Sequence, residues 1–522
     1  MKFIQAIMKT DVIIVGAGPT GLALACQLIR YGVDFVVFDK KETTTPHSKA
    51  IGVQARTLEI YEQIGLADKL IEQGAIAAKA RMVVGGEVRG EVEFGEMGKG
   101  LSPYPFVLVV EQGKHEKILY DFIKANGRDV LWNAELESFT QDETGVKANV
   151  KNANGETQTI EAKFLVGCDG AKSSVRHVLG LTFEGSTFER MFYVADVEID
   201  WKFSHDAGHA FLLKNSLLMF FPMTGEKQWR IVGTFPEEFA KNEGDVLYEE
   251  IEERIKQEAE LDLDITNVNW FSTYKVHTRH VNKFSVGRCF LAGDSAHIHT
   301  PAGAQGMNTG IQDGYNLAWK IWLVLREKAD AKLLETYNEE RLENAKNLLE
   351  TTDRMFEFVA SPEWFISNLR TRIFPYIARF AFGFDVVKNF VFPRVSQIGI
   401  NYRHSSLSKN NGTSSVKAGD RMPYFLVDGA SIYDKLRQPK FHLLVFSNAQ
   451  SDFQELKTEF ESQYAESIDF NVIPLSPQAA EVFGVDNSFN VLLRPDNYIG
   501  LISSETSLSD LRVYLNELIR HS

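Results

Sequence analysis

The sequence predicts an α/β fold in which a doubly wound domain carries an inserted antiparallel sheet and is followed by a third unit. Three observations predict this architecture. Residues 11–15 form a β-branched run that leads into a glycine turn and an apolar-periodic helix over residues 22–31. Residues 191–235 alternate short apolar runs with polar turns, which is typical of antiparallel strands. Residues 409–417 are mostly polar and small, so we expect a linker before the third unit.

The composition is that of a globular protein. The chain has 522 residues, of which 44% are hydrophobic and 24% charged, and domains of about 150 residues would give roughly three of them. Asp and Glu total 70 against 56 for Lys and Arg, and the net charge of −14 repels phosphate backbones. We therefore expect no nucleic-acid partner. The three cysteines, Cys26, Cys168 and Cys289, make no disulfide framework, which predicts a cytoplasmic location.

An uncharged segment near the N-terminus superficially resembles a membrane span. It covers 18 residues, from Val12 to Ile29. Its centre reads Gly16-Ala17-Gly18-Pro19-Thr20-Gly21, which would interrupt a continuous spanning helix. We therefore expect a strand, a tight turn and a helix here, and no membrane association.

The glycine turn predicts a dinucleotide site. Gly16, Gly18 and Gly21 have GxGxxG spacing, which gives a tight turn, a close approach to a pyrophosphate and close packing of helix on strand. A second strand, residues 35–38, ends in Asp39, where a carboxylate can accept hydrogen bonds from ribose hydroxyls. This unit leaves open whether the nucleotide is FAD or NAD.

Two later segments carry further strand-to-acid motifs. Residues 164–168 lead into Asp169-Gly170, followed by Ser173 and Arg176. Residues 287–293 lead into Asp294, followed by a glycine-containing loop over residues 301–308. With the glycine turn, these motifs give the chain a close resemblance to the single-component, FAD-dependent aromatic hydroxylases, the class A flavoprotein monooxygenases. The resemblance covers Asp11 to about Tyr402 and is weaker beyond.

The resemblance implies FAD as cofactor and assigns residues to it. Asp294 would hold the ribityl chain, and the start of the following helix would face the flavin, where a positive helix end stabilises a reduced, anionic ring. Asp169 would lie near the pyrophosphate and help accept a nicotinamide cofactor. The implied cofactor-binding residues are Gly16, Gly18, Pro19, Thr20, Gly21, Asp39, Lys40, Lys49, Gln112, Asp169, Asp294, Gly306, Met307 and Asn308.

The resemblance also implies a reaction. NADPH or NADH would reduce FAD, and a flavin C4a-hydroperoxide would insert one atom of O2 into an aromatic, phenolic or polyketide-like substrate. The chain has no second GxGxxG unit, so the nicotinamide cofactor would bind transiently. Baeyer–Villiger oxygenation or antibiotic modification on the same scaffold remains an alternative, and so does a flavin reductase or dehydrogenase without oxygen insertion. We expect no metal site, because His297 and His299 lack acids at ligand spacing.

The expected domains follow from these motifs. Residues 1–185 and 287–408 would form the FAD-binding domain, of the glutathione-reductase type, and residues 186–286 the substrate sheet. Residues 418–522 resemble the thioredoxin-like domain of larger family members, and they contain no cysteine. We expect this last unit to be redox-inert and separable, and the protein to be a monomer or homodimer. The charged residues of 337–341 are expected on a solvated helix face.

The sequence says least about the substrate. Four residues are candidates for contacting it: Phe221, Trp229, Tyr274 and Pro301. No catalytic residue is assigned, and Tyr274, His277 and His299 are candidate bases by location alone. The strands offer Arg230 and Lys275 as cationic anchors among mostly apolar residues, so we expect a neutral, multi-ring phenolic or polyketide-like substrate over a small aryl acid.

Overall fold

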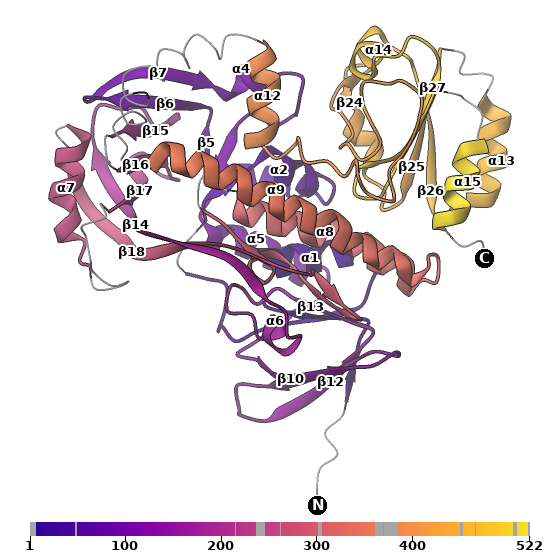
Figure 1. Ribbon diagram of the computed structural model, residues 1–522, viewed down its shortest axis with the longest axis horizontal. Coiled ribbons are helices and arrows are strands. Elements are labelled where there is room, and N and C mark those ends of the chain that lie inside the picture. The colour runs from indigo at the N-terminus through magenta and orange to yellow at the C-terminus, as the bar shows by residue number, and fades with distance from the viewer. Residues whose placement is uncertain are drawn as a thin grey trace, which may run out of the picture.

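The computed structural model describes residues 7–46, 50–213, 216–235, 246–260, 263–300, 305–360, 369, 385–448, 453–464, 466–504 and 509–519. Figure 1 shows a central layer of helices, a twisted sheet with its own helix at one side, and the C-terminal unit at the other. In this described part, no helix is long and apolar enough to cross a membrane.

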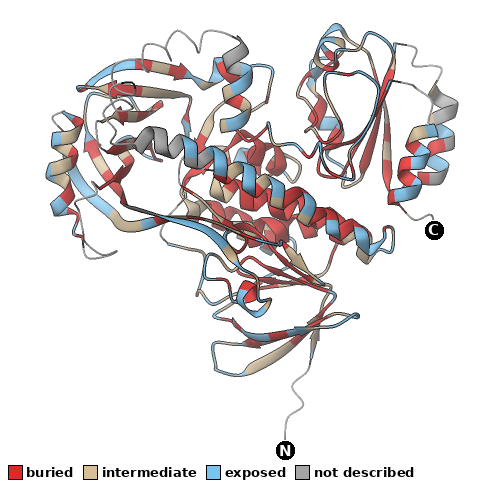
Figure 2. Ribbon diagram, in the orientation of Figure 1, coloured by how far each residue is buried: buried red, intermediate tan, exposed pale blue. Residues whose placement is uncertain are grey.

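The central sheet has six strands in the order β19-β20-β13-β2-β3-β9. Its parallel strands are apolar except for Asp39 at the end of β3, as expected where helices cover both faces. Helices α1 and α8 lie against each other beside it, and Figure 2 shows α8 buried along most of its length. The bounds are β2 (Val12–Val15), β3 (Phe35–Asp39), β9 (Val130–Trp132), β13 (Phe164–Gly167), β19 (Ser285–Val286), β20 (Cys289–Leu291), α1 (Pro19–Arg30), α5 (Gln112–Ala125), α8 (Gly306–Leu325) and α9 (Glu335–Ala360).

Smaller elements surround this layer. One sheet has the order β1-β12-β11-β10 and another the order β4-β8-β5. Their bounds are β1 (Met8–Lys9), β4 (Gly52–Val53), β5 (Ala75–Ala77), β8 (Val107–Val109), β10 (Glu135–Gln141), β11 (Val146–Lys151) and β12 (Thr157–Ala162). The short helices are α2 (Ala55–Glu62), α3 (Ala67–Glu72), α4 (Phe94–Gly98), α6 (Ser174–Val178) and α12 (Asp385–Val395), with 3₁₀ turns η1 (Gly293–Ser295) and η3 (Ala331–Leu334).

The second large sheet has eight strands in the order β21-β18-β14-β17-β16-β15-β6-β7. Two 18-residue strands, β14 (Phe183–Asp200) and β18 (Asp264–Val281), run from the central layer into this sheet. The other members are β6 (Lys79–Val84), β7 (Glu87–Glu93), β15 (Ala207–Leu212), β16 (Leu217–Pro222), β17 (Gln228–Thr234) and β21 (His297–Ile298), and α7 (Glu249–Ala259) covers one face. Because β6 and β7 join it, the sheet also draws on residues 79–93, outside the boundaries of 186–286 expected from the sequence.

The C-terminal unit is a five-stranded sheet in the order β22-β28-β27-β25-β26 with helices around it. The segment expected as a linker begins with β22 (Lys409–Asn411), which pairs with β28, so this part of it is an edge strand. The remaining bounds are β23 (Leu426–Val427), β24 (Ala430–Ser431), β25 (Phe441–Phe446), β26 (Ile468–Ile473), β27 (Phe489–Leu493), β28 (Ile499–Ser503), α13 (Gln454–Tyr464), α14 (Pro477–Phe483), α15 (Ser509–Leu518) and η5 (Ile432–Leu436).

The C-terminal unit shares a core with the central layer, contrary to the expectation of a separable unit. The Trp319 indole of α8 packs edge-on against Phe441, with ring centroids 5.9 Å apart. Arg494, fully buried, donates to Glu340 of α9 across the boundary, with Nη1 to Oε1 at 2.6 Å. Apolar contact and buried charge therefore both join the two parts.

Candidate flavin site

The glycine turn is a place where side chains do not fit. Gly16 has φ of +104°, and a Cβ there would lie 2.4 Å from the carbonyl oxygen of Cys168, which directly follows the neighbouring strand β13. A Cβ on Gly21 would lie 2.0 Å from the carbonyl oxygen of Gly16. Neighbouring backbone atoms therefore exclude any side chain at Gly16 and Gly21. This agrees with the roles expected of these glycines in the tight turn and in the packing of helix on strand.

Gly18 differs from its two neighbours in the motif. A Cβ added there would meet none of the described residues within 4 Å, and the Gly18 φ of −82° suits any residue. Gly18 is the N-cap of α1, Pro19 and Thr20 follow in the first turn, and no side chain caps the helix. The space beside a positive helix end is what a pyrophosphate needs, so this cradle fits FAD.

Asp39 at the end of β3 holds the turn. One carboxylate oxygen accepts from the backbone N–H of Ala17 at 2.7 Å, and the other accepts from that of Lys41 at 2.9 Å. Two acceptor positions per oxygen leave the carboxylate capacity for ribose hydroxyls. Lys40 is exposed, whereas Lys41 reaches back to the carbonyl of Ala17 at 3.4 Å. Lys40 was expected at this site from the sequence, whereas Lys41 was not.

A buried carboxylate extends this region toward α5. Glu116, with a fully buried side chain, accepts from Gln112 Nε2 at 2.9 Å and from the backbone N–H of Thr45 at 2.7 Å. Gln112 Oε1 accepts from the backbone N–H of Ala50 at 3.3 Å. The predicted Gln112 thus fixes the end of the loop that contains Lys49, and Lys49 itself lies outside the described residues. Glu116 was missed because a single helical acid gives no sequence signal.

The Asp169 motif is built around α6. The Asp169 carboxylate accepts from Ser173 Oγ at 2.5 Å and from the backbone N–H of Val175 at 3.2 Å. Arg176 is buried and donates to the carbonyls of Ser295 at 3.0 Å and Ala171 at 2.7 Å. Arg176 therefore fastens this motif to the Asp294 turn, which the sequence could not distinguish from a surface arginine.

Thr20 lies where the glycine turn meets the Asp294 turn and α8. A Cβ on Gly293 or on Gly310 would come within 2.4 Å of Thr20 Oγ1. Asp294, next to Gly293 in η1, is exposed at this junction. The two outer motifs, more than 250 residues apart in sequence, therefore meet at one edge of the central sheet.

The start of α8 is anchored from several sides. Asn308 Oδ1 accepts from the backbone N–H of Gln54 at 2.9 Å and from Thr57 Oγ1 at 2.7 Å, and Asn308 Nδ2 donates to the carbonyl of Gly52 at 2.8 Å. Met307 is half-buried against the main core. Gly306 lies beside His299, because a Cβ there would be 3.1 Å from His299 Nε2. Pro301 lies outside the described residues.

Asp313 of α8 supports the Asp294 turn from below. One carboxylate oxygen accepts from the backbone N–H of Gly293 and from His297 Nε2, both at 2.8 Å. The other accepts from Arg341 Nε of α9 at 2.6 Å. Burial alone would raise the pKa of Asp313, but the Arg341 and His297 interactions outweigh it and lower that pKa.

Residues 337–341 differ in part from the expectation of a solvated helix face. Glu340 and Arg341 are buried, although their charge suggested a solvated helix face, whereas Glu339 is exposed as expected. Amphipathic periodicity did not reveal this, because their partners are Asp313, 28 residues away, and the distant C-terminal unit. Asp313 and Arg341 therefore support the Asp294 turn, although no sequence pattern predicted either residue there.

The eight-stranded sheet has two apolar faces with different neighbours. Phe221 and Tyr274 lie on one face, and Tyr274 stacks on Phe192 with ring centroids 5.7 Å apart. Trp229 lies on the other face, packed edge-on against Trp201 in the core beneath α7. Strand alternation separates them, so Trp229 is corrected from a substrate contact to a core residue. We call the first face the substrate-side face: Phe192, Val194, Leu217, Met219, Phe221, Val232, Trp270, Tyr274 and Val276.

One charge pair lies on the substrate-side face. Arg230 is buried and donates through Nε and Nη2 to the two oxygens of Asp196, both at 2.6 Å. Its guanidinium lies 5.3 Å from the Trp270 ring centroid. Lys275, the other candidate anchor, is exposed and alternates with Tyr274, so it points away from this face.

The three candidate bases, Tyr274, His277 and His299, differ in protonation state or in position. Burial raises the pKa of Tyr274 to about 12, so its hydroxyl stays protonated. Burial lowers the pKa of His299 to about 4, and its Nδ1 lies 2.8 Å from the carbonyl of Thr300, which makes Nδ1 the donor and Nε2 an unprotonated acceptor. His277 Nδ1 bonds Thr187 Oγ1 at 2.8 Å on the opposite side of β18 from Tyr274.

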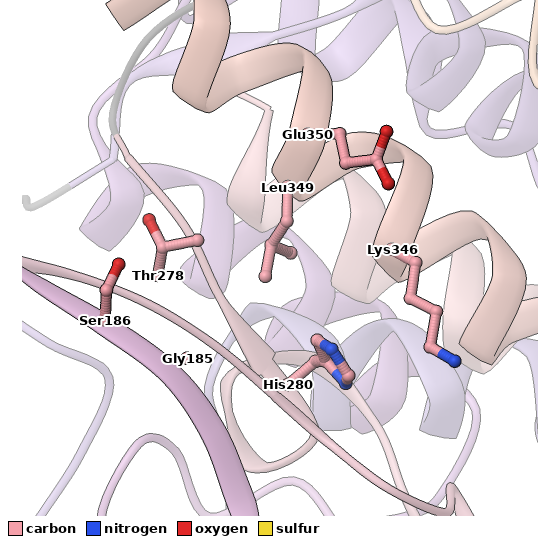
Figure 3. Close-up of a pocket in the computed structure, with 7 residues that line it drawn as sticks. All are labelled: Gly185, Ser186, Thr278, His280, Lys346, Leu349 and Glu350. Atoms are coloured by element: carbon pink, nitrogen blue, oxygen red, sulfur yellow. The ribbon is translucent and has the colours of Figure 1, made fainter. Parts of the chain in front are cut away.

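A shallow cavity of about 390 Å³ lies between α9 and the long strands (Figure 3). The side chains of Thr278 and His280 line it from β18, and Leu349 lines it from α9. Both β18 residues continue the row of Tyr274 and Val276, so the cavity opens beyond the end of the substrate-side face. Among the described residues, no group of three or more His, Cys, Asp or Glu side chains is placed to hold a metal.

Known proteins with similar sequences or a similar fold are flavin-dependent enzymes. Residues 9–352 match the FAD binding domain family. A flavin-dependent monooxygenase of Mycobacteroides abscessus is 32% identical over 94% of this chain and 97% of its own length. The pentachlorophenol 4-monooxygenase of Sphingobium chlorophenolicum is 30% identical over 94% of this chain and 93% of its own.

A solved structure shares the fold. The flavin-dependent monooxygenase PieE, crystallised with FAD and substrate, superposes with a TM-score of 0.82 at 20% identity over 98% of this chain and 100% of that one. The matched family covers most of the chain. In this chain, the space beside Gly18 in the glycine turn fits the pyrophosphate of FAD. The chain belongs to the FAD-dependent monooxygenases, and it is an enzyme of that class.

Proposed function

We propose that this monooxygenase hydroxylates a neutral, multi-ring phenolic or polyketide-like substrate at the expense of NADPH or NADH and O2. The observation that carries the proposal is the substrate-side face, where aromatic and aliphatic side chains surround a cation that Asp196 already neutralises. A carboxylate substrate would have to compete with Asp196 for Arg230, at the cost of an unpaired buried charge. A phenol avoids that competition, and the pentachlorophenol relative acts on one by its name.

We assign the FAD contacts residue by residue. Asp39, supported by Lys41, would hold the ribose of the adenosine half, and Gly18 with Pro19 and Thr20 would hold the pyrophosphate. Asp294 would hold the ribityl chain. When bound, FAD supplies the reduction of O2 and the transfer of one oxygen atom.

The start of α8, with Gly306, Met307 and Asn308, would face the flavin ring, where backbone N–H groups and the helix dipole favour negative charge. Gln112 and Asp169 would support the loops on either side.

Two side chains would orient the substrate. Tyr274 remains a hydrogen-bond donor, because its raised pKa keeps the hydroxyl protonated. His299 remains neutral, because burial lowers its pKa to about 4, so Nε2 accepts a hydrogen bond from a phenol without becoming charged. Increased electron density on the phenol oxygen raises the nucleophilicity of the ring.

We also propose the finer architecture: a glutathione-reductase-type FAD domain from residues 1–185 and 287–408, a substrate domain of residues 186–286 to which β6 and β7 add, and a thioredoxin-like unit of residues 418–522 to which β22 adds an edge strand. Residues 418–522 contain no cysteine, which supports a redox-inert unit. The cysteines of the chain, Cys26, Cys168 and Cys289, are buried and free, which supports a cytoplasmic location. A monomer or homodimer is expected, and size-exclusion chromatography with light scattering measures which.

Ligand-induced spectral change tests the substrate class. A neutral polycyclic phenol is expected to perturb the flavin absorption spectrum of the oxidised enzyme and to accelerate NAD(P)H oxidation more than 4-hydroxybenzoate does. Product analysis under ¹⁸O₂ should show one labelled oxygen on the ring. A labelled lactone or ester would instead indicate Baeyer–Villiger chemistry, and unlabelled product with NAD(P)H consumption a reductase.

Substitution of the charge pair provides the control. Arg230→Met with Asp196→Leu replaces the pair by apolar residues of similar volume, a change that buried ion pairs often tolerate. The double variant is expected to keep phenol binding. Preferential binding of 4-hydroxybenzoate by the wild type, abolished in this variant, would overturn the neutral-substrate assignment.

A further inference from the structure

The strongest connected feature outside the flavin loops is a buried ionic network at the boundary with the C-terminal unit. Arg494, which follows β27, donates through Nη1 and Nη2 to the two oxygens of Glu340 at 2.6 and 3.1 Å. It also donates through Nε and Nη2 to Asp496 at 3.0 and 2.5 Å. All three side chains are fully buried.

Glu340 is the point where this network enters α9. Besides Arg494, its carboxylate accepts from Lys320 Nζ at 2.8 Å and Asn316 Nδ2 at 2.6 Å, both on α8. Burial alone would raise the pKa of Glu340, but Arg494 and Lys320 hold it well below its usual range. Burial lowers the pKa of Lys320 to about 8, so Lys320 is a weak substitute for Arg494 as the counter-ion.

The neighbouring residue, Arg341, carries the connection to the flavin loops. Its guanidinium donates to Asp313 at 2.6 Å and to the carbonyl of Thr309, in the first turns of α8, at 3.2 Å. Asp313 in turn holds the Gly293 N–H of the Asp294 turn. One guanidinium thus fixes both the Asp294 turn and the start of α8.

A second route joins Arg494 to Arg341 through an aromatic side chain. Arg341 Nη1 donates to the Tyr402 hydroxyl at 2.8 Å, and the Arg494 guanidinium lies 5.3 Å from the Tyr402 ring centroid. Tyr402 also packs on Tyr498 of the C-terminal unit, with centroids 4.4 Å apart. Displacement of Arg494 therefore reaches Arg341 both through the backbone at Glu340 and through Tyr402.

From these contacts we infer that Arg494 is a positioning residue for the flavin: it fixes Glu340 and Tyr402, and through Arg341 and Asp313 it sets the separation of the Asp294 turn from the start of α8. The C-terminal unit then contributes to the geometry of the cofactor site, although it contains none of the flavin motifs. Loss of Arg494 leaves the carboxylates of Glu340 and Asp496 with one fewer cation between them, and the excess negative charge attracts Arg341 away from Asp313.

Three substitutions separate positioning from general stability. Arg494→Gln removes the charge at similar length. Arg437→Gln is the matched control, because Arg437 is an arginine of the same unit that reaches Glu62 across the boundary at 3.5 Å but is half exposed. Phe446→Leu destabilises the C-terminal unit from within its core, where Phe446 stacks on Phe489, without touching the network.

The readouts are the FAD dissociation constant, measured at a temperature where every variant is folded, and the visible circular dichroism of the bound flavin. Arg494→Gln is expected to weaken FAD binding roughly ten-fold and to change the dichroism spectrum. Arg437→Gln and Phe446→Leu should keep both at wild-type values. Wild-type affinity and spectrum in Arg494→Gln, or the same changes in Phe446→Leu, would overturn the inference.

If Arg494→Gln does not fold, Arg494→Lys decides, because it keeps the charge and loses the two-pronged geometry. It is expected to weaken FAD binding roughly three-fold with an altered dichroism spectrum, and unchanged values refute positioning. FAD binding by the wild type is measured in the same series, so failure of the cofactor assignment is distinguished from failure of this inference.

Discussion

At the scale of single residues, the glycine turn separates requirements of the protein from those of the ligand. Gly16 and Gly21 are required by backbone contacts within the protein, whereas a Cβ on Gly18 would have no atom of the described part of the chain within 4 Å. The same distinction holds between Asp294, which is exposed, and Asp313, which is fully buried between Arg341 and His297. In each pair, substitution of one residue is therefore expected to change FAD affinity, and substitution of the other to change the stability of the fold.

We expect Gly18→Ala to fold normally and to lose FAD affinity, because its methyl group occupies the space for the pyrophosphate and displaces charge-assisted hydrogen bonds worth about 1.5–3 kcal/mol, roughly ten- to a hundred-fold in affinity. Gly21→Ala is the control and should lower the melting temperature of the apoprotein instead, because its methyl group meets the Gly16 carbonyl. Thermal unfolding of both apoproteins and FAD titration measure this. A Gly18→Ala protein with wild-type affinity would mean that the pyrophosphate lies elsewhere.

Asp294→Ala should likewise weaken FAD binding roughly ten- to a hundred-fold, with a much smaller change in the melting temperature of the apoprotein, because substitution of an exposed side chain leaves the core packing intact. Asp313→Asn should reduce both stability and FAD binding, because Arg341 loses its buried counter-charge, a loss that costs about 3–5 kcal/mol. Denaturant unfolding and FAD titration of the two variants check this. Equal stability losses in the two variants would contradict the assignment of Asp294 to the ligand.

At the scale of elements, the sheets and α8 determine which residues can meet. Parallel strands β2 and β13 bring Gly16 beside Cys168 and Asp169, and β20 delivers Asp294 to the same edge. The antiparallel register of β14 with β18 places Phe192 opposite Tyr274 on one face and sends Trp229 to the other. The C-terminal sheet attaches to α8 and α9 through Arg494 and shared apolar core.

We expect a chain that ends at Asn411 to be insoluble or unfolded. Truncation exposes the apolar side of α8 around Trp319, leaves Glu340 and Lys320 without Arg494, and removes the strand that pairs with β22. Soluble yield, FAD content and circular dichroism of the truncated chain, compared with the full chain, measure the outcome. A soluble, folded, yellow product would show that the interface is dispensable.

At the scale of the whole molecule, three histidines whose pKa is lowered predict sensitivity to acid. Burial lowers the pKa of His115, His209 and His299 to about 4 each. The unfolded chain, with histidine pKa values near 6.5, binds more protons than the folded chain between these values, so stability falls as pH decreases through that window. Each histidine contributes a loss of roughly 2 kcal/mol at pH 5 relative to pH 8.

Denaturant unfolding at pH 8 and pH 5 checks this prediction. The control is His115→Gln, whose unfolding free energy should depend less steeply on pH, because one of the three sites is removed. A wild-type unfolding free energy that is flat between pH 8 and pH 5 would contradict the neutral state of these histidines.

The sequence by itself determined a dinucleotide-binding unit, because the GxGxxG turn and the terminal acid Asp39 depend on short, local spacing. The order of this unit and the two later acids carried the resemblance to the FAD-dependent hydroxylases, which implied FAD as the cofactor. The sequence also determined that short antiparallel strands lie between the motifs. Local patterns of this kind specify backbone conformation within one strand–turn–helix unit, and the α/β fold follows from their order.

Only the tertiary structure decided which polar side chains act together. The partners of Asp313, Glu116 and Arg341 come from elements distant in the chain, so no local pattern marks them. Strand alternation revealed that Phe221 and Trp229 lie on different faces only once the register was known. The attachment of the C-terminal unit could not be predicted for the same reason. Arg494 and Glu340 are buried only because two surfaces of the folded chain meet and pair them. In a sequence, charged residues predict exposure, because they are rarely buried without a partner of opposite charge.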